Sequence, residues 1–208
     1  ATNCIGTPKT FTITVNPSGQ VNQPTNQVVC NNTATNAVNF STTNTNGTTS
    51  YAWSINTNIG LSPLTGTGDL PSFTAINTGT TPITATITVT PTYNGTSICN
   101  GTSKTFTITV NPSGQVNQPT NQVVCNNTAT STVNFSTTNT VGTTSYAWSF
   151  DTNIGLIPLT GSGNIPSFTA VNTGTTPIVA TITVTPTFTN GATNCIGTPK
   201  TFTITVNP

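Results

Sequence analysis

Cysteine is the reactive side chain that this sequence offers most often. The chain has five cysteines and no histidine, with only three lysines and two aspartates as charged residues. A nucleophilic cysteine requires an adjacent base, and structural zinc requires four nitrogen or sulfur ligands. Because the sequence lacks both such a base and a Cys-x-x-Cys spacing, we expect no metal site, no cofactor and no cysteine catalysis. The cysteines instead predict disulfides in an exported protein.

The two aspartates do not form a catalytic pair. The chain contains an internal repeat, in which Asp69 aligns with Asn164 and Asp151 aligns with Asn56. Acid–base catalysis depends on positioned titratable groups, and neither copy of the repeat holds two carboxylates. We therefore expect both aspartates to lie in turns and the protein not to be an enzyme.

The three lysines each begin one copy of the pattern Lys-Thr-Phe-Thr-Ile-Thr-Val-Asn-Pro, at 9–17, 104–112 and 200–208. A lysine at the start of an edge strand discourages pairing with other chains. An isopeptide bond would require a buried lysine beside an amide and a catalytic carboxylate. Because each aspartate is present in only one copy, edge protection is the favoured role of Lys9, Lys104 and Lys200.

Composition excludes several classes of function. The chain has 208 residues, of which 32% are apolar and 2% charged, with a net charge of +1. Ordinary globular proteins have roughly a quarter charged residues. A chain of so little charge has no electrostatic surface for nucleic acid or anionic lipid, and no apolar run approaches the ~20 residues of a membrane span. No signal peptide is present, so we expect a mature segment or a segment of a longer chain.

The repeat sets the expected domain boundaries. Cys30 recurs as Cys125 and Trp53 as Trp148, each 95 residues later, and one residue is inserted after Pro186. Residues 1–17 reappear unchanged as 192–208. The sequence therefore predicts two domains, 18–112 and 113–208, with 1–17 as the last strand of a preceding repeat in a longer array.

Alternating apolar and threonine side chains predict β-strands with one buried face. Asn, Pro and Gly separate these runs, and no segment has the 3.6-residue apolar period of a helix. The spacing predicts an all-β fold of tandem antiparallel sandwiches in an extended array. In the first repeat the expected strands are 21–29 (interrupted by Pro24), 37–41, 50–55, 72–77, 83–90 and 104–110, with 60–71 as a loop or short edge strand.

Aromatic residues in these runs predict the core. Ile55 becomes Phe150 in the second copy, an exchange that keeps apolar character as a packing position should. The tryptophans could alternatively be sugar-binding platforms, but their place in alternating strands favours a packing role. The expected core anchors are Trp53, Trp148, Phe106 and Phe202.

An ordered set of short motifs resembles a known group of repeats. Tyr-Ala-Trp-Ser at 51–54 and 146–149 is similar to strand C of PKD and immunoglobulin-like domains. Val-Val-Cys-Asn-Asn precedes it, and Pro-Ser-Phe-Thr-Ala, Thr-Ala-Thr-Ile-Thr-Val-Thr-Pro, a cysteine and the lysine-led strand follow. The whole set resembles PKD-like repeats of giant Bacteroidetes surface proteins, including gliding adhesins. The Trp-Asp-Phe-Gly-Asp-Gly form of standard PKD domains is absent, which indicates a divergent branch.

This resemblance implies tandem β-sandwiches that are exported by the type IX route and lie outside the cell or on its surface. It also bears on the disulfides. In an immunoglobulin-like order Cys30 and Cys99 lie at opposite ends of a sandwich, too far apart for the ~4.4–6.8 Å Cα separation of a disulfide. The favoured pair is therefore Cys30–Cys195 between domains, with Cys4, Cys99 and Cys125 bonding to repeats outside the sequence. If Cys30 lies well inside a strand, the alternative pairs are Cys30–Cys99 and Cys125–Cys195.

Two functions follow from these observations. The favoured one is a structural repeat segment of an extracellular filament or giant adhesin, acting as a stiff non-catalytic stalk whose partners are neighbouring repeats or copies of the same chain. The alternative is a module that binds glycan or ice through its threonine-rich strand faces, and it predicts an unbroken threonine face or exposed aromatic residues on every domain. A single giant chain and strand exchange between chains both remain open.

Overall fold

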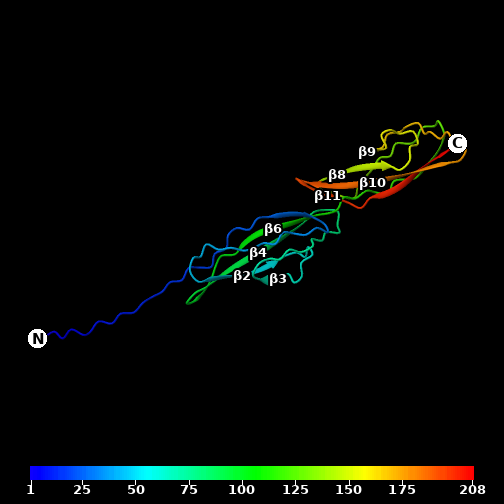
Figure 1. Cartoon of the computed structure of the whole chain (residues 1–208). Helices are drawn as coiled ribbons and strands as arrows, with labels where there is room; N and C mark the ends of the chain where they lie inside the picture. Colours follow the sequence, from blue (N-terminus) through cyan, green and yellow to red (C-terminus); the bar gives the residue numbers. More distant parts are fainter.

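The computed structural model describes all residues, 1–208, and contains strands but no helix. The strands form two separate six-stranded sheets, which lie end to end in an elongated molecule (Figure 1). We call the unit containing the first sheet the first domain and the other the second domain. The predicted all-β class is confirmed. None of the elements is a helix that could span a membrane.

The two domains repeat the same series of strands. The strands of the first domain are β1 (Gln27–Cys30), β2 (Thr48–Ile55), β3 (Thr65–Thr67), β4 (Ile83–Asn94), β5 (Ile98–Asn100) and β6 (Lys104–Asn111). Those of the second domain are β7 (Gln122–Cys125), β8 (Thr143–Phe150), β9 (Thr160–Ser162), β10 (Ile178–Asn190), β11 (Thr193–Ile196) and β12 (Lys200–Asn207).

The strand order is immunoglobulin-like, but the sheet is mixed rather than purely antiparallel. The first sheet runs β1-β6-β4-β2-β3, with β5 on β4, and the second has the same order from β7 to β12. β1 is parallel to β6, and β7 is parallel to β12. All other strand pairs are antiparallel, as predicted. The first strand departs from this pattern because it changes from the second layer, the irregular segments that cover one face of the sheet, to the sheet itself. Asn22 still bonds to Ser41 of the second layer, and after Pro24 the chain joins the edge of β6.

Side-chain amides complete the edge of β6 before β1 begins, which is why the predicted strand 21–29 shrinks to Gln27–Cys30. The Gln23 amide donates to the Thr105 carbonyl at 2.8 Å, and the Asn26 side chain accepts from Thr107 N at 2.8 Å. Pro24 lacks an N–H and cannot extend the ladder. Amide side chains therefore take the place of backbone groups in this segment.

The second layer is thinner than predicted. The expected strands 37–41 and 72–77 are not regular strands and meet only through the bridges Ala34↔Thr74 and Val38↔Leu70. Between these bridges the Thr35 hydroxyl accepts from Phe73 N at 3.1 Å, so a side chain substitutes for the ladder. Local bonds of this kind compete with regular strands.

β4 continues past the predicted end at residue 90, and β5 was not predicted. β4 pairs with β6 up to Val89 and with β5 from Thr92 onward. Pro91 lies at the break between these two partners, where a missing N–H interrupts neither ladder.

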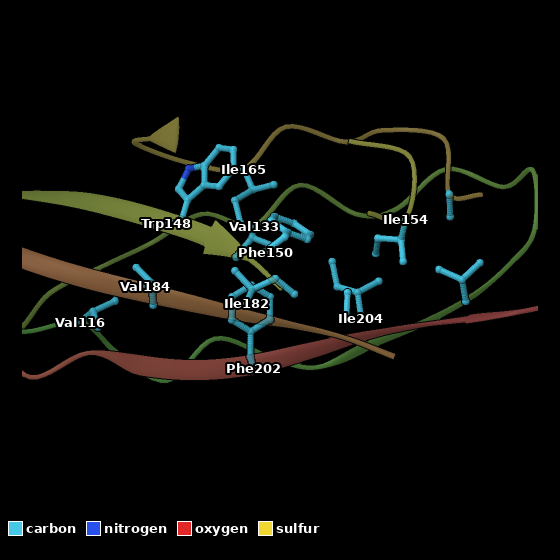
Figure 2. Close-up of a cluster of buried hydrophobic side chains, with 13 residues drawn as sticks. Val116, Val133, Trp148, Phe150, Ile154, Ile165, Ile182, Val184, Phe202 and Ile204 are labelled. Atoms are coloured by element: carbon cyan, nitrogen blue, oxygen red, sulfur yellow. The ribbon is translucent and has the colours of Figure 1, made fainter. Parts of the chain in front are cut away.

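Each domain has its own core between the sheet and the thin second layer. The cores contain the predicted anchors, with Trp53 and Trp148 7% and 8% exposed and Phe106 and Phe202 each 2% exposed. Figure 2 shows Phe202 and Ile182 of the second sheet facing Val133 and Ile165 of the second layer.

Residues 1–17 form no strand in this chain and extend away from the first domain (Figure 1). Phe11, Ile13 and Val15 are 84%, 78% and 87% exposed. Their counterparts in β12, which has the same sequence, are almost completely buried. The predicted strand at 9–15 is therefore unpaired here, and the prediction that it completes a preceding repeat stays a prediction.

Candidate functional site

The candidate functional site is the junction between the two domains. β6 ends at Asn111, and Pro112, Ser113 and Gly114 lead directly into the second domain. Gly114 lies so close to that domain that a Cβ would be 2.7 Å from the Pro186 carbonyl oxygen. The linker is therefore packed against the second domain and cannot act as a free hinge.

A disulfide crosses this junction. Cys30, the last residue of β1, is bonded to Cys195 in β11 of the second domain, with an S–S distance of 1.97 Å and a Cα–Cα distance of 5.4 Å. The structure contains this inter-domain pair, and Cys99 and Cys125, the partners in the alternative pairs, are free thiols together with Cys4. Since Cys30 ends its strand, its side chain can reach the neighbouring domain.

Hydrogen bonds reinforce the junction on the side of a turn, residues 78–81. The Thr80 carbonyl accepts from Thr140 N and from the Asn139 amide, both at 3.4 Å. Asn77 holds the turn from below, since its buried amide donates to Thr81 O at 2.8 Å and to Val110 O at 2.7 Å. The turn thus presents a fixed acceptor to the second domain.

A second group of bonds surrounds the linker. The Asn31 amide donates to the Ser113 hydroxyl at 3.3 Å, and the Asn190 amide donates to Asn111 Oδ1 at 3.1 Å. Asn111 is fully buried, and its own amide nitrogen has no hydrogen-bond partner.

The junction asparagines were not predicted from the sequence. Asparagine is abundant throughout this chain, and composition therefore hides the few with a structural role. One signal was present: Asn31, Asn44 and Asn77 are unchanged in the second copy as Asn126, Asn139 and Asn172.

The aspartates lie in different domains and serve as hydrogen-bond acceptors. Asp69 Oδ1 accepts from Phe40 N, and Asp151 Oδ1 accepts from Thr181 N, both at 2.8 Å. The bond from Thr181 N lowers the pKa of Asp151 below its usual value. In the aligned copies an asparagine oxygen makes the same bond, which explains why Asp and Asn exchange at these positions. No carboxylate pair is formed.

The lysines and tyrosines also lack a shared site. Lys9 and Lys200 are exposed and Lys104 is half-buried, so the burial that an isopeptide bond requires is not met. Burial raises the pKa of Tyr51 and of Tyr146, each opposed by a bond to a threonine hydroxyl.

The threonine face is present but interrupted. On β4 and β6, Thr84, Thr86 and Thr88 stand opposite Thr109, Thr107 and Thr105 on the outer face of the first sheet. In the second domain Val179 takes the place of Thr84 opposite Thr205, and it is 52% exposed. Phe11, outside both domains, is the exposed aromatic residue. The face therefore does not repeat unbroken on every domain, as a binding module would require.

Comparison with known proteins finds solved structures of tandem domains, all at low similarity. No family model matches the sequence, and no curated protein matches it. A three-domain immunoglobulin segment of titin, I67–I69, is 7% identical with a TM-score of 0.39, and covers 91% of this chain, which spans 64% of that segment. The Ig1-2 module of the Drosophila receptor tyrosine phosphatase DLAR is 12% identical with a TM-score of 0.32, covering 92% of this chain and 100% of its own. Human mucin-like protocadherin EC1-2 is 10% identical with a TM-score of 0.33, covering 91% and 98%. The immunoglobulin-like assignment therefore depends on the strand order and layers described above.

Proposed function

We propose that this chain is a structural segment of an extracellular filament or cell-surface adhesin, and that its domains act as a stiff, non-catalytic stalk. The observation that carries this proposal is the junction, in which a disulfide, a packed linker and several hydrogen bonds join two domains end to end. A disulfide is stable in an oxidising, extracellular environment. The resemblance to repeats of giant bacterial surface proteins supports the same location.

Stiffness follows from the number of independent restraints at the junction. Domains joined by a flexible linker move relative to one another unless their interface is large. Here Cys30–Cys195 restrains one side, the Thr80 carbonyl restrains a second site and Gly114 fixes the linker between them. Restraints at separate points oppose bending in more than one direction.

The proposal is tested by comparing the alignment of the two domains in solution. Residual dipolar couplings measured in a weakly aligned sample should fit one alignment tensor for both domains of the oxidised chain. The double variant C30S/C195S should keep both sheets but give tensors of different magnitude, because one restraint is lost. Two different tensors in the oxidised wild type would show that the domains swing independently, and the stalk would be rejected. Antibody labelling of intact source cells tests the location.

A further inference from the structure

The N-terminal end of the first domain has the same local structure as the occupied end of the second domain. In both domains a glycine N–H of the linker donates to a cysteine carbonyl, and the next residue donates to an asparagine side chain. The bonds are Gly19 N to Cys99 O (3.3 Å) and Gln20 N to Asn44 Oδ1 (2.9 Å) in the first domain, and Gly114 N to Cys195 O (3.1 Å) and Gln115 N to Asn139 Oδ1 (2.9 Å) in the second. The N-terminal end of the first domain therefore has the same local arrangement as the end of the second domain that contacts its neighbour.

A groove lies at this end of the first domain. It is lined on one side by Thr43–Asn46 and Tyr93, and on the other by residues 14–17 of the N-terminal segment. In the second domain the residues equivalent to Asn44 and Thr45 are Asn139 and Thr140, which bind the Thr80 carbonyl. The groove thus corresponds to the position that holds the turn 78–81 at the junction between the two domains, which we call the closed junction.

The opposite end of the molecule carries such a turn. Residues 173–176 have the same sequence as 78–81, and Asn172 holds them as Asn77 holds the first turn, through bonds of 2.9 Å to Thr176 O and 2.8 Å to Val206 O. Cys125, an exposed free thiol, is the equivalent of Cys30. Every group that the first domain contributes to the closed junction is repeated at the C-terminal end of the second.

We propose that the N-terminal end of the first domain binds the C-terminal end of a domain like the second, and that Cys99 forms a disulfide with the Cys125 of that domain. The partner is a second copy of this repeat. The inference rests on the proposed stalk and deepens it, because it makes all junctions of one kind. A chain of identical junctions has a constant rise and rotation per domain.

The bond forms by thiol–disulfide exchange with a small-molecule disulfide such as oxidised glutathione. The Cys99 thiolate attacks one sulfur of glutathione disulfide and releases one glutathione thiolate. The Cys125 thiolate then attacks the mixed disulfide, forms the Cys99–Cys125 bond and releases the second. Two protein thiols are oxidised, one glutathione disulfide is reduced to two thiols, and the two protons pass to the released thiolates.

Mixing two single-thiol variants tests the proposal. The donor of the C-terminal end is the full chain carrying C4S/C99S, whose free thiol is Cys125. The acceptor is C125S without residues 1–17, whose free thiol is Cys99. Residues 1–17 are removed because β12 of the donor already occupies the place that they would take, and they belong to neither sheet. In a glutathione buffer the mixture should give a covalent one-to-one dimer containing a Cys99–Cys125 peptide.

The matched control moves the thiol along the same strand. Val123 is 69% exposed and lies two residues before Cys125 on the same face of β7. A donor carrying C4S/C99S/C125S/V123C should give about tenfold less mixed dimer, because a docked junction raises the effective concentration only of a correctly placed thiol. Equal yields from both donors, or no Cys99–Cys125 peptide, would overturn the proposal. If the oxidised chain still fits one alignment tensor, the stalk would stand and only this inference would fail.

Discussion

The first and second domains share their strand order, and the residues in which they differ show which features the fold requires. A few buried apolar positions change between the copies and stay apolar, as where Ile55 becomes Phe150 and Tyr93 becomes Phe188. Asp69 and Asp151 are each replaced by an asparagine in the other copy, which keeps an acceptor for the same backbone N–H. The glycines beneath the tryptophans and the asparagines beneath the junction turns do not change. The volume of some core side chains can therefore differ between the domains, whereas the glycine–tryptophan contacts and the hydrogen bonds of the buried asparagine amides are the same in both.

The largest expected effect comes from the glycines that face the tryptophan rings. A Cβ on Gly66 or on Gly161 would lie 2.2 Å from Cζ2 of Trp53 or Trp148. Gly66→Ala and Gly161→Ala should therefore each destabilise their own domain by about 3 kcal/mol, the upper end of overpacking costs. Hydrogen exchange of β4 and β10 measures the two domains separately in one sample.

Gly68→Ala is the matched control for Gly66→Ala. Gly68 has φ +73° and no atom within 4 Å of an added Cβ, so it tests backbone strain without a clash. Its cost should be about 1 kcal/mol. If Gly66→Ala accelerated hydrogen exchange of β4 but Gly161→Ala left that of β10 unchanged, the two tryptophan sites would not be equivalent.

The next effect separates what the domains share from what the junction adds. Asn77→Ala and Asn172→Ala each remove two hydrogen bonds from the side-chain amide to buried or half-buried carbonyls. Each should lower the free energy of unfolding of its own domain by about 2–3 kcal/mol. The bonds have nearly equal lengths, but in this chain only the turn above Asn77 contacts another domain.

Asn77→Ala should therefore also change the relative alignment of the domains, whereas Asn172→Ala should leave it unchanged. Residual dipolar couplings measure this second consequence, and hydrogen exchange measures the first. Equal loss of alignment in both variants would mean that the turn does not transmit order to the junction.

Much of this arrangement was predictable from residue patterns, and the remainder depends on contacts that patterns do not encode. Alternation and the repeat predicted β2, most of β4, β6 and the four core anchors, because a half-buried strand imposes a period of two. The second layer was overestimated because Thr35 bonds to the backbone in place of a ladder, and the strand at 21–29 was overestimated because Gln23 does the same at the edge of β6. Nothing local in the sequence shows which side chains do this.

The junction was predictable only in outline. An even number of cysteines per repeat and an immunoglobulin-like order favoured a bond between Cys30 and Cys195, because geometry limits which cysteines can meet. The roles of Asn31 and Asn190 depend on how two domains are placed, and that placement is set by packing across the linker. Comparison of the two copies reveals such residues only as unchanged asparagines among many others.

A smaller effect tests the exchange of Ile55 and Phe150. Phe150 makes edge contacts with Trp148 at 5.8 Å and Phe168 at 6.1 Å between ring centroids, whereas Ile55 has no ring. Phe150→Ile should cost the second domain about 1–2 kcal/mol, since each aromatic pair contributes about 0.5–1.5 kcal/mol beyond its buried area. Denaturant unfolding followed by exchange of β10 measures the loss, and the first domain is the internal control. A change below about 0.5 kcal/mol would show that the extra ring only fills volume.

The smallest effect concerns Asp151 and its counterpart Asn56, and it depends on pH. Because the bond from Thr181 N lowers the pKa of Asp151 in the folded state, its carboxylate stabilises the second domain above the ordinary pKa of 3.8. That stability is lost as the pH falls through the lower, folded pKa. Between pH 5 and about 2 the second domain of the wild type should therefore lose more stability than that of Asp151→Asn.

The reciprocal change, Asn56→Asp, should transfer this pH dependence to the first domain, since Thr86 N donates to the same position at 2.8 Å. Thermal unfolding of the two variants and the wild type across this pH range measures both effects. Asp151 is exposed, so solvent screens the interaction. The pH-dependent change in stability should therefore be the smallest effect predicted here. An Asp151→Asn variant with unchanged acid sensitivity would mean that the position requires only an acceptor, and that charge has no part in the difference between the domains.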